Sequence, residues 1–91
     1  MKNKSHRIYV SAEDIKNGRY SDQYKCPVAL ATSRHFKNMV SVSSTDIVVS
    51  KTTGSRSYIA PQKVTNFVID FDSGRKMKPF RFTLRKKREY T

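Results

Sequence analysis

The hydrophobic residues of this chain recur first at every second position, then about every 3.6 positions, and then again at every second position. This change of period limits the possible folds more than any other sequence feature. Residues 39–60 hold short runs of alternating apolar and polar side chains between turn residues, which predicts a three-stranded meander. In the next segment four apolar side chains share one helical face, namely Val64, Phe67, Val68 and Phe71. Alternation then returns in a last predicted strand, with Phe80, Phe82 and Leu84 on one face and Arg81, Thr83 and Arg85 on the other. The chain therefore combines helices with strands.

The N-terminal third is expected to hold one strand and two short helices. Residues 8–10 form a short β-favouring run, and Ser11 after it is suited to cap a helix with two acids in its first turn. We expect this helix to stop before Gly18, because glycine tolerates the left-handed backbone found at helix C-termini. Pro27 suits the first position of a second helix, since its missing N–H is not needed there.

The expected element order is β-α-α-β-β-β-α-β, and the expected fold class is α+β, with a mostly antiparallel sheet covered by helices on one face. A chain of 91 residues has room for one core. We therefore predict a single domain over residues 1–84 and a basic C-terminal tail over residues 85–91. No apolar run approaches the ~18 residues of a membrane span, and no secretion signal follows the charged N-terminus. Together with a single cysteine, Cys26, these features predict a cytoplasmic protein with no membrane partner.

Positive charge is concentrated at the C-terminal end of the chain. The whole chain carries 19 Lys plus Arg against 7 Asp plus Glu, a formal net charge of +12. Residues 73–91 hold eight of these bases and one acid, so most of the excess lies there. The consecutive bases at 85–88 repel one another unless solvent or an anionic partner surrounds them. Two interpretations remain open: a solvated tail that aids solubility, and an electrostatic surface for nucleic acid or an acidic protein.

The sequence offers little catalytic or metal-binding chemistry. The candidate metal ligands share no recognisable pairwise spacing; they are Cys26, His6 and His35. Cys26 stands at a predicted helix start, where the dipole can lower a thiol pKa, but a buried structural cysteine is the preferred interpretation. Asp70 and Asp72 are expected to cap the end of a helix and to pair with Arg75. No phosphate-binding glycine motif is present, so we expect no metal, no cofactor and no enzymatic activity.

The C-terminal bases are the candidate binding residues. They would contact phosphates along one line and release counterions, without base-specific readout. The predicted nucleic-acid-binding residues are Arg75, Lys76, Lys78, Arg81, Arg85, Lys86, Lys87 and Arg88. Tyr20, Tyr24 and Tyr90 lie beside bases in the sequence and could stack on unpaired nucleotides, although partly buried packing is the preferred role for each.

Several short motifs resemble those of a group of small uncharacterised bacteriophage proteins. The motifs are Ile15-x-x-Gly18, the run Cys26-Pro27-Val28-Ala29-Leu30-Ala31, the run Phe71-Asp72-Ser73-Gly74-Arg75, and the run Pro79-Phe80-Arg81-Phe82. The resemblance covers most of the chain, and its motifs mark helix starts, a turn and a core strand. It implies a phage accessory gene as the source and no assigned activity. The end of this chain is far more basic than the ends of those proteins.

Three functions from different classes are consistent with these features. The first is a non-enzymatic phage-type accessory protein that binds nucleic acid electrostatically through its C-terminal strand and tail. The second is a stoichiometric inhibitor of a host defence or nucleic-acid-processing enzyme, of the anti-CRISPR or anti-defence type, which docks on an acidic host protein or nucleoprotein surface. The third is a minor structural component of a virion. A homodimer is compatible with an exposed sheet edge.

Overall fold

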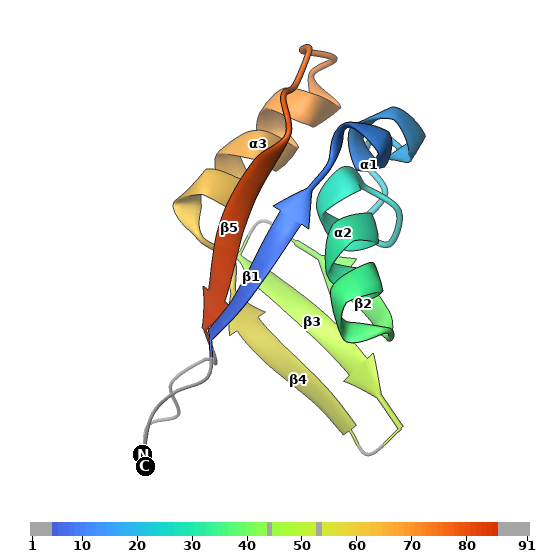
Figure 1. Ribbon diagram of the computed structural model, residues 1–91, viewed down its shortest axis with the longest axis vertical. Helices are drawn as coiled ribbons and strands as arrows, with labels where there is room; N and C mark the ends of the chain where they lie inside the picture. Colours follow the sequence, from blue (N-terminus) through green and yellow to red (C-terminus); the bar gives the residue numbers. More distant parts are fainter. Residues whose placement is uncertain (1–4, 44, 53, 86–91) are drawn as a thin grey trace.

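The computed structural model describes residues 5–43, 45–52 and 54–85. Its elements follow the predicted order (Figure 1) and are β1 (Ser5–Val10), α1 (Ala12–Asn17), α2 (Pro27–Phe36), β2 (Met39–Val42), β3 (Asp46–Lys51), β4 (Gly54–Ile59), α3 (Gln62–Asp72) and β5 (Phe80–Arg85). The α+β class is therefore confirmed. β5 includes Arg85, the first residue of the predicted tail, and the rest of that tail lies outside the described residues.

The strands divide between two antiparallel sheets rather than forming one. β2, β3 and β4 make the predicted meander as a three-stranded sheet. β1 pairs with β5, so strands from opposite ends of the chain form a two-stranded ribbon. The two sheets meet where β4 contacts β5. Figure 1 shows α3 alongside β5 and α2 alongside β1, so helices flank the ribbon on both sides.

α1 begins after Ser11, as predicted, because this side chain caps the helix. Ser11 Oγ accepts a hydrogen bond from the Asp14 N–H at 3.1 Å, and the Asp14 carboxylate accepts one from the Ser11 N–H at 2.9 Å. Arg34 of α2 donates to both carboxylate oxygens of Asp14, at 2.6 and 2.8 Å. The buried carboxylate therefore joins α1 to α2.

The reason for a glycine after α1 differs from the one predicted. Gly18 does follow the helix, but its φ of −70° is ordinary extended backbone, so the expected left-handed conformation is wrong. A Cβ at this position would lie 2.5 Å from both Cγ and Cδ of Pro27. Gly18 is needed because the first residue of α2 lies directly against its backbone.

The core lies between the ribbon, the three-stranded sheet and the inner sides of α2 and α3. Its fully buried side chains include Ile8, Val10, Val28, Val40, Ile47, Val49, Val64 and Leu84. The predicted apolar stripe of α3 is confirmed, since three of its residues are buried and Val68 is partly buried. The ring of Phe67 lies 4.6 Å from that of Phe80, which ties α3 to the start of β5. No helix in the described ranges has the length and apolar character needed to cross a membrane.

Candidate nucleic-acid interface

The ribbon of β1 and β5 has an apolar inner face and a cationic outer face. Alternation along the two strands buries Ile8, Val10, Phe82 and Leu84 and exposes Arg7, Tyr9, Arg81 and Thr83. The register sets Tyr9 opposite Arg81 and Arg7 opposite Thr83. We call these four exposed residues the cationic ribbon face. Its two arginines are diagonal neighbours, a separation of about 7–8 Å between Cα atoms in a regular antiparallel pair.

Arg81 makes the contacts that organise this face. Its guanidinium carbon lies 5.2 Å from the centre of the Tyr9 ring, which is a cation–π contact. Its backbone carbonyl accepts a hydrogen bond from Nζ of Lys63 at 3.1 Å. Lys63 stands in the first turn of α3, so this bond brings a third cation to the edge of the ribbon.

A groove of about 550 Å³ lies beside the cationic ribbon face. It is lined by Arg7, Pro61, Lys63, Arg81, Phe82 and Thr83. Three of these residues are basic and none is acidic. No ion pair links Arg7, Lys63 or Arg81 to a carboxylate within the described part of the chain. Positive charge that is not neutralised internally attracts anions to a surface, so the groove suits a phosphate-bearing ligand.

The other predicted binding residues lie before and after β5 in the sequence. Those exposed in the described chain are Arg75, Lys76 and Lys78, which lie between α3 and β5. Arg85 ends the strand, where its backbone pairs with Ser5. Predicted residues that lie outside the described ranges are Lys86, Lys87 and Arg88.

Two cations of the groove were missed by sequence reasoning. Arg7 and Lys63 are far from the C-terminal bases along the chain, and only the pairing of β1 with β5 and the contact of α3 with β5 bring them there. The sequence does hold a partial signal for the exposed position of Arg7. Arg7 and Tyr9 alternate with two apolar residues, which is typical of a strand with one solvent-facing side.

The exposed tyrosine on this surface is not one of the three that the sequence analysis considered as stacking candidates. Tyr9, on the cationic ribbon face, is 48% exposed. Tyr20 stacks on Phe71 at 4.7 Å between ring centres but is 61% exposed, so it packs on the surface and is less buried than its packing interpretation expects. Tyr24 is exposed in the segment before α2, and Tyr90 lies outside the described residues.

The two histidines meet, although their sequence positions gave no sign of it. His6 Nδ1 lies 3.2 Å from His35 Nε2, and the His6 ring also contacts Phe36 at 4.7 Å between ring centres. The His6 ring is half-buried at the end of α2. Within the described ranges, no group of three or more His, Cys, Asp or Glu side chains could hold a metal ion.

Cys26 is a buried structural residue, as predicted. Its Sγ accepts a hydrogen bond from the Ala29 N–H at 3.4 Å and so caps α2. Burial raises the pKa of the Cys26 thiol, and this outweighs the opposing effect of the N–H groups of the first turn. A thiol of this kind is mostly protonated at neutral pH, which does not suit a nucleophile.

The prediction that the carboxylates of Asp70 and Asp72 pair with the guanidinium of Arg75 is wrong. Asp72 Oδ1 instead accepts a hydrogen bond from the Ser21 N–H at 2.8 Å, which ties the end of α3 to the segment before α2. Arg75 reaches Asp70 through the backbone alone, with its N–H donating to the Asp70 carbonyl at 3.1 Å. The Arg75 side chain is therefore exposed to solvent in the connection between α3 and β5.

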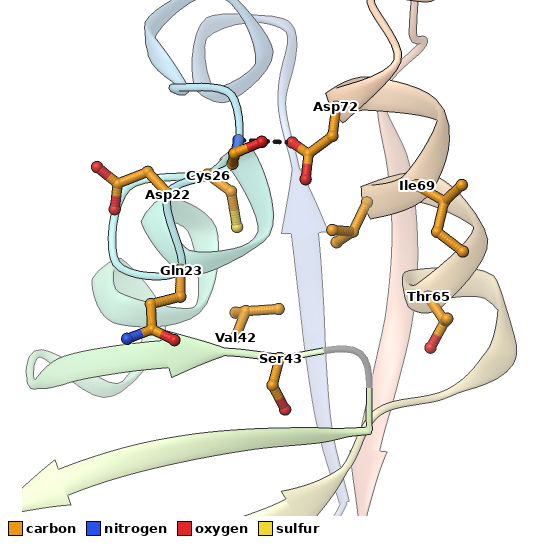
Figure 2. A pocket seen from close by; sticks show the side chains of 10 residues that line it. Asp22, Gln23, Cys26, Val42, Ser43, Thr65, Ile69 and Asp72 are labelled. Atoms are coloured by element: carbon orange, nitrogen blue, oxygen red, sulfur yellow. Dashed lines mark hydrogen bonds between the residues drawn. The ribbon is translucent and has the colours of Figure 1, made fainter.

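A second hollow, of about 320 Å³, lies between α3, the end of β2 and the segment before α2 (Figure 2). Its apolar lining residues are Cys26, Val42, Val68 and Ile69. Two carboxylates, Asp22 and Asp72, also line it. The charge at this hollow is therefore opposite in sign to that of the groove beside the ribbon, and the hollow fits an apolar or cationic group better than a phosphate.

Comparison with protein-family models, with curated proteins and with solved structures found no match to this chain. Function is therefore inferred from the geometry and charge of the chain itself.

Proposed function

We propose that this chain is a non-enzymatic, phage-type accessory protein that binds nucleic acid electrostatically in the host cytoplasm. The proposed contact surface combines the cationic ribbon face and Lys63 with the bases before and after β5. The bases proposed to contact phosphates are the eight predicted from the sequence, Arg75, Lys76, Lys78, Arg81, Arg85, Lys86, Lys87 and Arg88, together with Arg7 and Lys63 from the groove. Each base that neutralises a phosphate releases counterions, so affinity depends strongly on salt.

One observation carries this proposal: the groove beside the ribbon is lined by three bases and no acid. Surface bases in proteins are often paired with nearby carboxylates, but no carboxylate lines this groove, and Asp70, which lines a neighbouring hollow with Lys63 and Lys78, forms no ion pair with either. Asp14 is held by Arg34, while Asp22 and Asp72 line the hollow on another side of α3. The segregation of charge favours an anionic partner over a merely solvated surface.

Charge reversal on the ribbon tests the proposal directly. The double variant Arg7→Glu with Arg81→Glu changes two exposed side chains on the cationic ribbon face. We expect binding to a labelled oligonucleotide to weaken at least about tenfold, because two attractive phosphate contacts become repulsive. The measurement is fluorescence anisotropy in low salt, with circular dichroism to verify that the variant is folded.

The matched control is the double variant Lys51→Glu with Arg56→Glu, which removes the same charge from exposed positions on β3 and β4. We expect this control to retain most of the affinity. Equal losses in the two variants would mean that only net charge matters and that the ribbon is not the binding surface.

A second candidate function, stoichiometric inhibition of a host defence or nucleic-acid-processing enzyme, is favoured by the hollow in Figure 2. Ile69 at this hollow is 57% exposed, and exposed apolar side chains beside a concave surface are common at protein interfaces. This candidate predicts co-purification with one host protein and loss of that protein from the Ile69→Asp variant. Retention of the host protein by the variant would reject this docking surface.

A further inference from the structure

We infer that the nucleic acid bound by the ribbon is single-stranded, with an unpaired base stacked on the ring of Tyr9. This inference rests on the proposed function, because it names the kind of nucleic acid that the same face would take. It also assigns a role to a residue that packing does not explain. Tyr9 is on the face of β1 opposite to the core and leaves 48% of its surface in water.

The surroundings of Tyr9 match what single-strand binders require. Such proteins combine bases that follow the phosphate backbone with aromatic rings on which bases stack. Arg81 lies 5.2 Å from the centre of the Tyr9 ring and is its partner in the strand register. Arg7 is two residues away on the same face. A base on Tyr9 would therefore have cations beside it to hold the adjoining phosphates.

The Arg81 contact also prepares the ring for binding. A cation–π contact restricts the directions in which an exposed tyrosine can point. Less side-chain freedom is then lost when a base stacks on it, which favours binding. The hydrogen bond from Lys63 to the Arg81 carbonyl holds the strand beneath this pair.

The shape of the ribbon argues against a duplex ligand. A two-stranded ribbon reads the base edges of a duplex by entering one of its grooves. Here α3 and α2 run alongside the two strands, so the ribbon is not a projecting arm (Figure 1). In a duplex the bases are stacked on one another, so their faces are not available to Tyr9. An unpaired strand offers both its phosphates and its base faces to this surface.

The test compares three labelled probes in low salt by fluorescence anisotropy, with the full chain in each case. The probes are a fifteen-nucleotide oligothymidine, an abasic strand with the same number of phosphates, and a fifteen-base-pair duplex. We expect the wild-type chain to bind oligothymidine about tenfold more tightly than the abasic strand, because stacking on one base is worth roughly that factor. The Tyr9→Ala variant should bind both single strands equally, and Tyr9→Phe should retain the preference.

Tyr24→Ala is the matched control, because Tyr24 is 49% exposed but lies in the segment before α2, away from the ribbon. It should behave as the wild type. Equal wild-type affinity for oligothymidine and the abasic strand, or a preference that survives Tyr9→Ala, would overturn the stacking inference. If binding still depended on Arg7 and Arg81, the proposed function would stand. Binding of no probe at all would overturn both.

Discussion

At the scale of single residues, Asp14 is the only charged side chain that is buried in the described part of the chain. It is 4% exposed, and its carboxylate accepts hydrogen bonds from the Ser11 N–H, the Ser11 hydroxyl and the Arg34 guanidinium. Burial alone would raise the pKa of Asp14. The bonds from Arg34 and Ser11 outweigh this effect and hold the pKa below its usual value.

We predict that Asp14→Asn lowers the free energy of unfolding by about 1–3 kcal/mol, because the partly buried Arg34 contact and the helix cap both lose their charged acceptor. The measurement is urea unfolding at pH 7. The control is Glu13→Gln, the neighbouring acid, which is exposed and should change stability by less than about 0.5 kcal/mol. Equal stability of Asp14→Asn and wild type would contradict a structural role for the pair.

The contact between Asp14 and Arg34 also predicts that the stability of the fold depends on pH. A carboxyl whose pKa is lower in the folded than in the unfolded chain stabilises the fold above its unfolded pKa, which is about 3.9. This stabilisation is lost as the pH falls from that value through the folded pKa. We therefore expect the stability gap between wild type and Asp14→Asn to be constant near neutrality and to narrow below about pH 4. A gap that does not narrow in acid would show that the carboxylate charge is unimportant.

At the scale of elements, the close contact of α1 and α2 depends on Gly18. A Cβ on this backbone would point at the Pro27 ring and lie 2.5 Å from it, and that ring is buried at the first position of α2. We predict that Gly18→Ala lowers the free energy of unfolding by about 1–3 kcal/mol, because one of the two segments must shift. Asn17→Ala, at the exposed neighbouring position, is the control. The measurement is thermal unfolding. An unfolding temperature that is unchanged in Gly18→Ala would show that the two segments can move apart without loss of stability.

The elements themselves were largely predictable, and their pairing was not. Each helix and strand has an apolar period of its own, so the stripe on α3 and the alternation in β5 could be recognised from local sequence. The pairing of β1 with β5 joins residues 70 to 80 positions apart, and no local pattern specifies it. The candidate site depends on that pairing, which explains why Arg81 was predicted and Arg7 and Tyr9 were not.

At the scale of the whole molecule, the distribution of charge is the feature that most concerns function. The chain carries a net charge of +12. Bases occupy the ribbon, the first turn of α3 and the connection before β5, while two of the acids gather at the hollow near the end of β2. Sequence arithmetic located the basic segment, but only the three-dimensional arrangement shows that a groove without acids adjoins it.

The most direct test of the central claim, that the cationic ribbon face binds nucleic acid, is the salt dependence of binding. Oligothymidine affinity is measured across a salt series for the wild type, for Arg7→Glu with Arg81→Glu, and for Lys51→Glu with Arg56→Glu. Each phosphate contact on a single strand contributes about 0.7 to the slope of log K against log salt. We predict that the ribbon variant has a slope shallower by about 1.4 and that the control keeps the wild-type slope. An unchanged slope in the ribbon variant, or an equal change in both variants, would contradict the claim.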